Sequence, residues 1–483
     1  MSNPPDHAPA SLVPLAVDLD GTLIRSDMLW ESLARLLREK PLALLAVPFW
    51  WLRGRAFLKQ QLAARVTVDA TALPYHEEFL AWLKTEKLAG RKLILATASD
   101  IKMAEPVARH VGLFDEVLAS DGKTNLRDHA KLAALTKKFG ERGFDYAGNS
   151  AVDLDVWQGT RTAVVVNASE SLARRAAERT TVGRTFLEKP STFMSVLRCL
   201  RPHQWIKNLI VFVPVLTGHE FGDRLILVQA TLAFVAFCLC ASSTYLLNDL
   251  TDLDADRHHA RKRKRPFAAG TLPLSYGFAG APLLFLAGLA IAVSLSPAFA
   301  SVILIYFAAT LAYSWQVKQI AMLDVFFLAG LYTMRLVGGH VATDIKWSAW
   351  LLVFSMFIFL SLALMKRVQE LLSVRESNGH EVKGRGYTAN DLELVSMLGV
   401  VSGFIAVLVL ALYVNSDQVK ELYGEPTLLL LVCPLLLYWI ARVWLLAHRG
   451  QMHEDPTAFA FKDWVSYAIG ALTLGVMWLA TGR

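Results

Sequence analysis

Long apolar runs fill the chain from about residue 201 to its end. A helix needs about 20 mainly apolar residues to cross a bilayer, and most of these runs have that length. The pattern therefore predicts an all-α, polytopic membrane domain of about nine transmembrane helices over residues 201–483. The candidate segments lie near 206–218, 225–247, 274–294, 298–315, 321–340, 347–365, 392–414, 427–447 and 464–481, and the first and fourth are short.

The first 166 residues follow a different pattern, in which short apolar runs alternate with helical stretches. Leu12–Val17 and Lys92–Ala96 are typical of buried strands, whereas residues 28–88 are typical of helices. Within the helical part, Pro41–Leu52 is apolar but too short to cross a membrane. We expect an α/β domain over residues 1–166, with a helical part over residues 28–88 that can touch lipid.

Residues 167–200 connect these two parts. The stretch from Ser169 to Arg184 is polar and basic, with arginines at 174, 175, 179 and 184. It fits either a surface helix lying on anionic lipid headgroups or a solvated linker helix.

Composition supports a membrane protein with more than one domain. The chain has 483 residues, a hydrophobic content of 54% and a formal net charge of +7, and its mean hydropathy is +0.38. Its four cysteines form no CxxC pair, so we interpret them as reduced packing residues rather than a zinc site or a disulfide framework. The N-terminal stretch, Met1–Ser11, has no signal-peptide core, so the first domain is expected in the cytosol.

The positions of the basic residues predict the topology of the membrane domain. Starting from a cytosolic first domain, the alternating loops 248–273, 366–391 and 441–463 fall on the cytosolic side and carry most of the lysines and arginines. This agrees with the positive-inside rule. We expect a multi-pass protein of a bacterial-type inner (plasma) membrane, with the first domain and the chemically interesting loops facing the cytosol.

Two acids follow the first strand in the sequence Asp18-Leu19-Asp20-Gly21-Thr22. In α/β folds, ligands bind at the carboxyl ends of the strands, so both carboxylates are placed for chemistry. The first can attack phosphorus and the second can protonate the leaving oxygen. Gly21 allows the chain to turn away sharply.

This DxDGT motif resembles the haloacid-dehalogenase superfamily of phosphatases, and the resemblance covers nearly all of residues 1–166. It implies a Rossmannoid fold in which residues 28–88 form a helical cap over the active site. It also implies a phosphate-holding hydroxyl at Thr97 (or, second, Ser99) and a phosphate-neutralising lysine at Lys131. The fourth motif of that family matches residues 148–153, with Asn149 in the place of its first acid and Asp153 as its second. The implied cofactor is Mg²⁺, with Asp18, Asp20, Asn149 and Asp153 as candidate ligands. An inactive, structural phosphatase fold is the alternative, because Asn149 brings no charge.

A second acidic segment follows the apolar run 225–247. Asn248, Asp252 and Asp256 are spaced by four residues, so on a continuing helix they share one face. Charge so close to lipid usually marks a substrate or ion path. Oxygen ligands on one face suit Mg²⁺, which binds through one or two carboxylates plus substrate phosphates. A solvated acidic loop, balanced by the basic cluster from Arg261 to Arg265, is the alternative.

Basic and amide side chains accompany these acids in the loops expected on the same side. Acids that hold Mg²⁺ and bases that hold phosphate are together what a diphosphate leaving group requires. Each base could also serve only to anchor the topology. The candidate phosphate- and substrate-binding residues are Lys207, Asn208, Asn248, Arg265, Lys318, Arg335, Lys366 and Arg367.

The second part of the chain resembles the UbiA superfamily of intramembrane prenyltransferases, over essentially all of residues 198–483. The NxxxDxxxD pattern at residues 248–256 matches its first signature. The second acidic signature of its aromatic prenyltransferases is missing, because a lone Asp324 stands in that region. Together with RPxQWxKN at 201–208, KRPxAAG at 264–270 and KRxxE at 366–370, the sequence is most similar to the branch of decaprenyl-phosphate phosphoribosyltransferases.

That resemblance implies transfer of 5-phosphoribosyl from phosphoribosyl diphosphate to a polyprenyl phosphate, with Asp252 and Asp256 holding Mg²⁺ on the departing diphosphate. The product carries a 5-phosphate, which the phosphatase domain is expected to remove. The expected partners are therefore a polyprenyl phosphate lipid, phosphoribosyl diphosphate and the membrane, with no nucleic acid. The oligomeric state stays open. The competing hypotheses are an aromatic prenyltransferase, a membrane scaffold with a degenerate phosphatase head, and a transporter.

Overall fold

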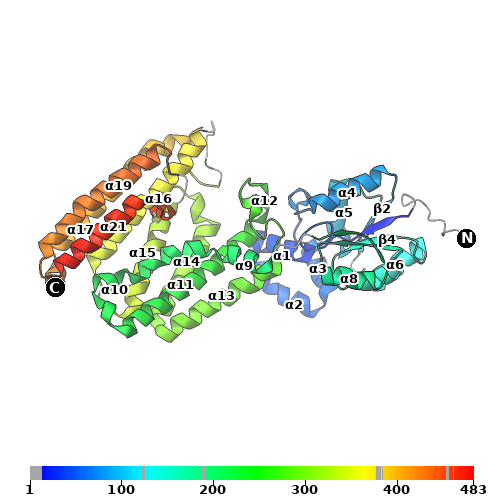
Figure 1. The fold of residues 1–483 in the computed structure, drawn as a ribbon, viewed down its shortest axis with the longest axis horizontal. Coiled ribbons are helices and arrows are strands. Elements are labelled where there is room, and N and C mark those ends of the chain that lie inside the picture. Colours follow the sequence, from blue (N-terminus) through cyan, green and yellow to red (C-terminus); the bar gives the residue numbers. More distant parts are fainter. Residues whose placement is uncertain are drawn as a thin grey trace, which may run out of the picture. The chain divides into compact units, whose positions relative to one another are not determined.

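The structure is a computed structural model that describes residues 13–121, 126–127, 129–187, 191–376, 382, 384–452, 456–460 and 462–482. The stretch Met1–Ser11 lies outside the described residues. The chain divides into two compact units (Figure 1). Unit 1 comprises Met1–Arg201 and Tyr245–Ala281, and unit 2 comprises Pro202–Thr244 and Pro282–Arg483. The acidic segment thus belongs to the same compact unit as the α/β domain.

A parallel six-stranded sheet forms the centre of unit 1, which confirms the expected α/β class. Its order is β3-β2-β1-β4-β5-β6, so that β1 pairs with β2 on one side and β4 on the other. All three residues of β1 are buried, as expected for a central parallel strand covered on both faces. The strands are β1 (Leu15–Val17), β2 (Leu93–Asp100), β3 (Glu116–Ser120), β4 (Asp145–Gly148), β5 (Thr162–Val166) and β6 (Thr181–Phe186).

The sheet extends into the segment that was expected to be a connector. Strand β6 pairs with β5 in parallel, and α8 (Glu170–Ala177) lies between them in sequence. Residues 170–186 therefore contribute a helix and an edge strand to the α/β fold, and neither of the two connector hypotheses describes them. The sequence does not indicate this strand because β6 is exposed at four of its six positions and therefore has little apolar pattern. The strand is defined by its pairing with β5 in the folded unit.

Helices connect the strands of unit 1, and those between β1 and β2 form its cap. The cap expected over residues 28–88 is confirmed as mainly helical. Its elements are α1 (Met28–Glu39), η2 (Pro41–Ala46), α2 (Val47–Leu52), α3 (Arg55–Ala63), η3 (Ala70–Ala72) and α4 (Glu77–Leu88). The remaining helices around the sheet are α5 (Ile101–Val111), α6 (His129–Phe139) and α7 (Asp153–Gln158), and α9 (Thr192–Leu200) follows β6 in the chain.

Helix α11 (Arg224–Thr251) begins in unit 2 and ends in unit 1. It is followed by α12 (Leu253–His258), η6 (Lys262–Lys264) and the start of α13 (Leu274–Leu295). The ring of Phe278 in α13 lies 5.4 Å from that of Trp30 in α1, so the beginning of an apolar helix packs on the cap.

Unit 2 is entirely helical in its described part. It contains η4 (Pro202–Phe212), α10 (Val213–Thr217), η5 (Glu220–Gly222), α14 (Pro297–Trp315), η7 (Val317–Gln319), α15 (Leu323–Thr343), α16 (Ala349–Glu376), η8 (Ala389–Asp391), α17 (Leu392–Val414), α18 (Asp417–Leu422), η9 (Pro426–Leu431), α19 (Val432–His448), α20 (Pro456–Ala460) and α21 (Trp464–Ala480), besides most of α11 and α13. Close approach of α16, α17 and α19 (Figure 1) depends on small residues. A Cβ on Gly399 would lie 2.3 Å from the ring of Trp444.

Seven helices among the described residues are long and apolar enough to cross a membrane: 224–251, 274–295, 297–315, 323–343, 349–376, 389–414 and 426–448. The expected count of nine is not confirmed. The segment near 206–218 forms the 3₁₀ turns of η4 and the short α10, because Pro214 and the preceding turns interrupt a regular helix. The last segment is helix α21, whose 17 residues make it a shorter apolar helix.

Candidate active sites

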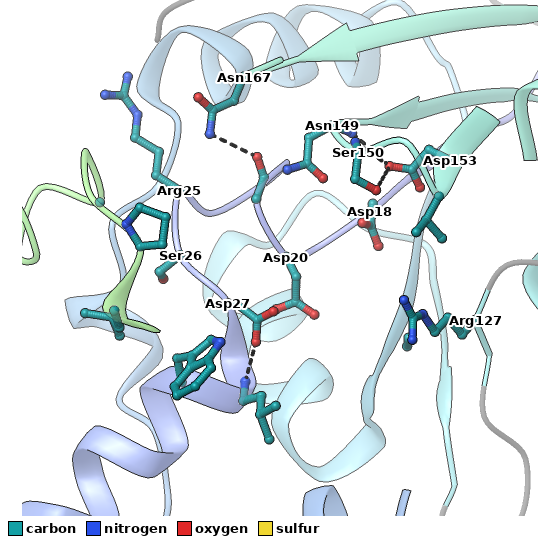
Figure 2. Close-up of a pocket in the computed structure, with 18 of the residues that line it drawn as sticks. Asp18, Asp20, Arg25, Ser26, Asp27, Arg127, Asn149, Ser150, Asp153 and Asn167 are labelled. Carbon is teal, nitrogen blue, oxygen red and sulfur yellow. Dashed lines mark hydrogen bonds between the residues drawn. The ribbon is translucent and has the colours of Figure 1, made fainter. Parts of the chain in front are cut away.

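The phosphatase-like site lies at the carboxyl end of the central strand β1. Asp18 and Asp20 follow this strand directly, and Gly21 turns the chain with a positive φ of 75°. Figure 2 shows the carboxylate of Asp18 between those of Asp20 and Asp153. Neighbouring parallel strands end at the same edge, so residues far apart in sequence converge there, as expected.

Lys131, from α6, is bound directly to the first acid. Its Nζ donates to Asp18 Oδ1 at 2.7 Å and to the hydroxyl of Tyr146 at 2.8 Å. Tyr146 in turn donates to Asp153 Oδ1 at 2.9 Å. The other oxygen of Asp153 accepts from the backbone N–H groups of Asn149 and Ser150 at 3.0 and 2.9 Å. This buried network fixes the rotamers of the acid and the lysine.

Asp20 is held by the cap and by the second strand. Its Oδ1 accepts from the backbone N–H of Met28 at 2.8 Å, and its Oδ2 accepts from Ser99 Oγ at 2.8 Å. Thr97 is fully buried, and its Oγ1 accepts from the backbone N–H of Ser99 at 3.0 Å. Neither hydroxyl is among the residues lining the cavity, whereas Ala98 between them is. In this state, Ser99 positions Asp20 and Thr97 supports Ser99.

Burial changes the acidity of these groups. Desolvation raises the pKa of Asp18 to about 7, against the lowering effect of Lys131. Desolvation, together with the nearby charge of Asp27, raises the pKa of Asp20 to about 6. Burial lowers the pKa of Lys131, but the carboxylates of Asp18 and Asp153 more than offset this, and its pKa lies above the usual value. An acid with a pKa near neutrality suits proton donation to a leaving oxygen.

The cavity above these acids has a volume of about 560 Å³ and contains residues that the sequence did not single out. Besides Lys131, its cations are Arg25, Arg55, Lys59 and Arg127, and its apolar wall includes Trp30 and Trp51. The lining also includes Gly270, Thr271 and Pro273, from the loop before α13, and Leu274, the first residue of α13. No local pattern marks these side chains, because the cap and the loop bring them to the strands only in the folded unit.

The oxygen donors at this site fit Mg²⁺, but they carry one negative charge fewer than the family's fourth motif usually provides, because Asn149 stands in the place of an acid. Asp18 and Asp153 offer carboxylate oxygens, and Asn149 offers an amide. Asn149 packs so tightly on Gly21 that a Cβ there would lie 2.0 Å from its Nδ2. Within the part of the chain that the structure describes, no group of three or more His, Cys, Asp or Glu side chains is arranged to hold a metal ion. Mg²⁺ that completes its shell with water and phosphate needs no such group.

The acidic segment forms a second site at the end of α11. Helical hydrogen bonds continue through the break between α11 and α12, from Asp252 N to Asn248 O at 2.9 Å and from Asp256 N to Asp252 O at 2.8 Å. Asn248, Asp252 and Asp256 therefore share one face, as the spacing of four predicts. Asp254 lies off this face and pairs with Arg35 of the cap.

Two arginines hold the buried acids of this segment. Arg265 Nη1 lies 2.5 Å from Asp256 Oδ2 and 3.2 Å from Asp249 Oδ1, and Arg201 also pairs with Asp249. Burial raises the pKa of Asp256, although Arg265 opposes the shift. Asp256 Oδ1 is buried and accepts no hydrogen bond, and Lys262 Nζ lies 4.0 Å from it. A buried carboxylate oxygen that accepts no hydrogen bond, on one helical face with Asn248 and Asp252, fits a Mg²⁺ ligand.

In unit 2, two of the predicted residues, Asn208 of η4 and Arg335 of the candidate membrane helix α15, form one buried cluster. Arg335 Nε donates to Asn208 Oδ1 at 2.7 Å, and its other nitrogens donate to Tyr306 Oη at 2.7 Å and to Leu331 O at 2.6 Å. The guanidinium also lies 5.2 Å from the ring centre of Tyr332. All these partners are uncharged, so a positive charge is held inside the bilayer region by neutral groups.

The other predicted bases of unit 2 lie in different surroundings. Arg367 is almost fully buried and pairs with Asp324, 2.7 Å away, and with Glu370. Tyr387 Oη donates to Asp324 at 2.6 Å, and Arg385 lies 3.6 Å from the same carboxylate. Asp324 is therefore a neutralised structural acid in this state. Lys207, Lys318 and Lys366 are half-buried, and Lys207 lies 5.9 Å from the ring centre of Tyr332.

Comparison with protein families matches both parts of the chain. Residues 211–466 match the UbiA prenyltransferase family, and residues 15–157 match the haloacid dehalogenase-like hydrolases. An uncharacterized protein, y4nM, of Sinorhizobium fredii is 39% identical over 95% of this chain and 89% of its own length.

A decaprenyl-phosphate phosphoribosyltransferase of Mycolicibacterium smegmatis is 38% identical over 208 residues, which are 41% of this chain and 64% of that relative. Among solved structures, a UbiA homolog of Archaeoglobus fulgidus bound to GPP and Mg²⁺ aligns with a TM-score of 0.46 at 15% identity, over 60% of this chain and 100% of the homolog.

Proposed function

The chain belongs to the UbiA prenyltransferase family, with a haloacid dehalogenase-like domain fused before its membrane domain, and from this we propose that it transfers 5-phosphoribosyl from phosphoribosyl diphosphate to a polyprenyl phosphate. We further propose that the fused domain removes the 5-phosphate from the lipid product. The observation that carries the proposal is the buried Asp256 carboxylate at the end of a membrane helix: Arg265 binds its Oδ2, its Oδ1 accepts no hydrogen bond, and it shares a helical face with Asn248 and Asp252. The 38% identity to a decaprenyl-phosphate phosphoribosyltransferase over part of each chain supports the choice of substrates.

In the transfer step, a phosphate oxygen of the lipid forms a bond to the anomeric carbon as the bond to diphosphate breaks. Asn248, Asp252 and Asp256 would hold Mg²⁺, which supplies charge neutralisation for the departing diphosphate. Arg265 is placed to assist, because it already lies beside Asp256. In this proposal Arg335, with Asn208, attracts the anionic lipid headgroup, since the groups that it binds here, Asn208, Tyr306 and the Leu331 carbonyl, are uncharged. Lys207, Lys318, Lys366 and Arg367 stay further phosphate-binding candidates.

In the hydrolysis step, Asp18 attacks the 5-phosphate and the P–O5 bond breaks. Asp20, with its pKa raised to about 6, protonates the departing O5. Water then releases phosphate from Asp18. Lys131 is bound to Asp18 and would neutralise the transferred phosphoryl group. The cations Arg25, Arg55, Lys59 and Arg127 suit a substrate that carries a second phosphate besides the one removed.

The experiment supplies labelled phosphoribosyl diphosphate and a polyprenyl phosphate to membranes that contain wild type or Asp18→Asn. Mass spectrometry of the lipid products distinguishes the two steps. We expect wild type to yield a polyprenyl phosphoribose without the 5-phosphate and the variant to retain it. The assignment of the second step is wrong if both products carry the same number of phosphates. The first step is wrong if neither yields a phosphoribosyl lipid.

Aromatic prenyl transfer is disfavoured by a specific contact. That reaction in this family uses a second acidic motif, and the acid in the corresponding region, Asp324, is paired with Arg367 and bound by Tyr387. Both oxygens of this single acid are contacted, Oδ1 by the Tyr387 hydroxyl and Oδ2 by Arg367, so it offers fewer free oxygens to a metal-bound diphosphate than an acidic motif would. Incubation with a prenyl diphosphate and a phenolic acceptor tests this alternative directly.

A further inference from the structure

The cap of unit 1 presents an exposed apolar surface formed by η2 and α2, which we call the 41–52 hairpin. Leu42, Leu45, Phe49 and Leu52 are between 69% and 82% exposed there. Four large apolar side chains in twelve residues make a contiguous patch of the kind that marks an interaction surface. At twelve residues the segment is too short to cross a bilayer, but it can lie in the interface.

Charge around the hairpin identifies the partner. From Lys40 to Lys59 the chain carries four cations and no acid; Lys40 and Arg53 flank the hairpin, and Arg55 and Lys59 face the cavity beside it. Trp50 and Trp51 lie within it, and the guanidiniums of Arg65 and Arg55 lie 4.6 and 5.3 Å from their ring centres. An apolar face with tryptophans suits the acyl chains near the membrane surface, and neighbouring basic residues without acids suit anionic lipid headgroups.

Contacts within unit 1 bring the cap to the place where a membrane helix begins. Trp30 of α1 packs on Phe278, in the second turn of the apolar helix α13. A Cβ on Gly270, just before that helix, would lie 2.6 Å from Arg25 Cβ. Helix α1 leads directly into the hairpin at Pro41. The hairpin is therefore joined, through α1, to the start of an apolar helix that is long enough to cross a membrane.

We propose that the 41–52 hairpin inserts into the lipid interface and holds the phosphatase-like cavity at the membrane surface. Trp51 and Arg55, at the end of the hairpin and just after it, line that cavity. A phosphorylated lipid could then place its headgroup in the cavity while its chain stays in the bilayer. Insertion itself does not depend on the proposed reactions, because it rests only on the hairpin and its neighbours.

The test uses the full chain in nanodiscs with anionic lipids, in a Cys433→Ser background. A fluorescent NBD group on Leu45→Cys reports on the hairpin, and the same group on Leu88→Cys is the matched control, since Leu88 is an exposed leucine at the end of α4. We expect nitroxides on lipid acyl chains to quench the label at position 45 at least twofold more than at 88. Equal quenching at the two positions overturns the proposal. A shielded label at 45 that lipid nitroxides do not quench also overturns it, because protein then covers the hairpin.

A second variant tests the consequence for catalysis. In it, Leu42, Leu45, Phe49 and Leu52, none of which lines the cavity, are all replaced by Gln. We expect hydrolysis of a soluble phosphomonoester to stay within twofold of wild type, while hydrolysis of a lipid-borne phosphomonoester falls at least tenfold. Wild-type rates on both substrates would show that insertion does not present the lipid. If the domain hydrolyses nothing, the proposed function fails while the quenching result still decides insertion.

Discussion

Arg257 donates to both carboxylate oxygens of Glu31, at 3.0 and 2.6 Å, although the two residues are 226 positions apart. Both side chains are almost fully buried. Glu31 belongs to the cap of the phosphatase-like domain, and Arg257 belongs to the helix that carries Asp256. The ion pair thus ties the acidic segment of the UbiA family to the cap of the fused domain, within one compact unit.

Removing one partner of this pair is expected to be costly. Glu31→Ala leaves the Arg257 charge buried and should destabilise unit 1 by about 3–5 kcal/mol. The control Lys87→Ala removes the exposed pair with Asp115 and should cost less than about 1 kcal/mol. Thermal unfolding in detergent measures both. A loss for Glu31→Ala no larger than that of the control would mean that the pair contributes little.

The two acids of the α12 turn should differ in function. Asp256→Asn removes the negative charge and leaves a single amide oxygen, so it is expected to lower phosphoribosyl transfer more than about 100-fold, since even outer partners of a metal ligand contribute 10–100-fold. Asp254→Asn is the control, because Asp254 pairs with Arg35 and lies off the shared face. It should retain transfer within a few-fold. Radiolabelled product in membranes gives both rates, and equal losses would remove the metal-binding role of the shared face.

Arg335 should matter for the transferase and not for the phosphatase. Arg335→Met keeps most of the side-chain volume but removes the charge that Asn208 and Tyr306 hold. We expect the KM for polyprenyl phosphate to rise at least tenfold, while hydrolysis of a soluble phosphomonoester is unchanged. Asn208→Leu should show a smaller rise, because it removes a positioning contact and leaves the charge. An unchanged KM would exclude Arg335 as a lipid-phosphate ligand.

Asn149 should limit metal binding at the phosphatase-like site. Asn149→Asp is nearly isosteric and adds a charge beside Asp153, so the Mg²⁺ concentration for half-maximal hydrolysis should fall about tenfold. Asn167→Asp is the control, because Asn167 also touches the Gly21 loop, through its 3.3 Å hydrogen bond to Gly21 O. Titration with Mg²⁺ and a soluble phosphomonoester measures the change. An unaltered half-saturation would show that residue 149 does not contact the metal.

Cys199 should be unreactive at ordinary pH. Burial raises the pKa of its thiol to about 12, and reaction with a maleimide requires the thiolate. Because the pKa lies above the usual value, the thiolate fraction at pH 8 should be about 1,000-fold smaller than for an exposed cysteine. Alkylation followed by mass spectrometry, with Leu88→Cys as the exposed control, checks this. Comparable labelling of both residues would contradict the burial of Cys199.

Much of the local chemistry could be predicted from the sequence. The apolar run before Asp18 and the DxDGT motif were enough to place two acids at the end of a strand, because a strand and the turn after it are set by neighbouring residues. The spacing of four among Asn248, Asp252 and Asp256 was enough to place them on one helical face. The expectation for the connector was wrong because the polar edge strand β6 is defined by its pairing with β5, which is not a local property of the sequence.

The residues that complete the sites could not be predicted in this way. Arg25, Lys59 and Gly270 line the cavity because the cap and the loop before α13 fold onto the same strand ends. Asp254 turns to Arg35, and Asp324 is neutralised by Arg367, through contacts between distant segments.

By itself, therefore, the sequence determined the two kinds of domain, the membrane helices and the motifs that carry acids, because periodicity and short spacing are local properties of the chain. Only the tertiary structure decided which acids are neutralised and which keep an oxygen without a partner. Long-range pairs such as Glu31 and Arg257 leave no periodic signal, and their energy depends on a burial that exists only in the folded chain.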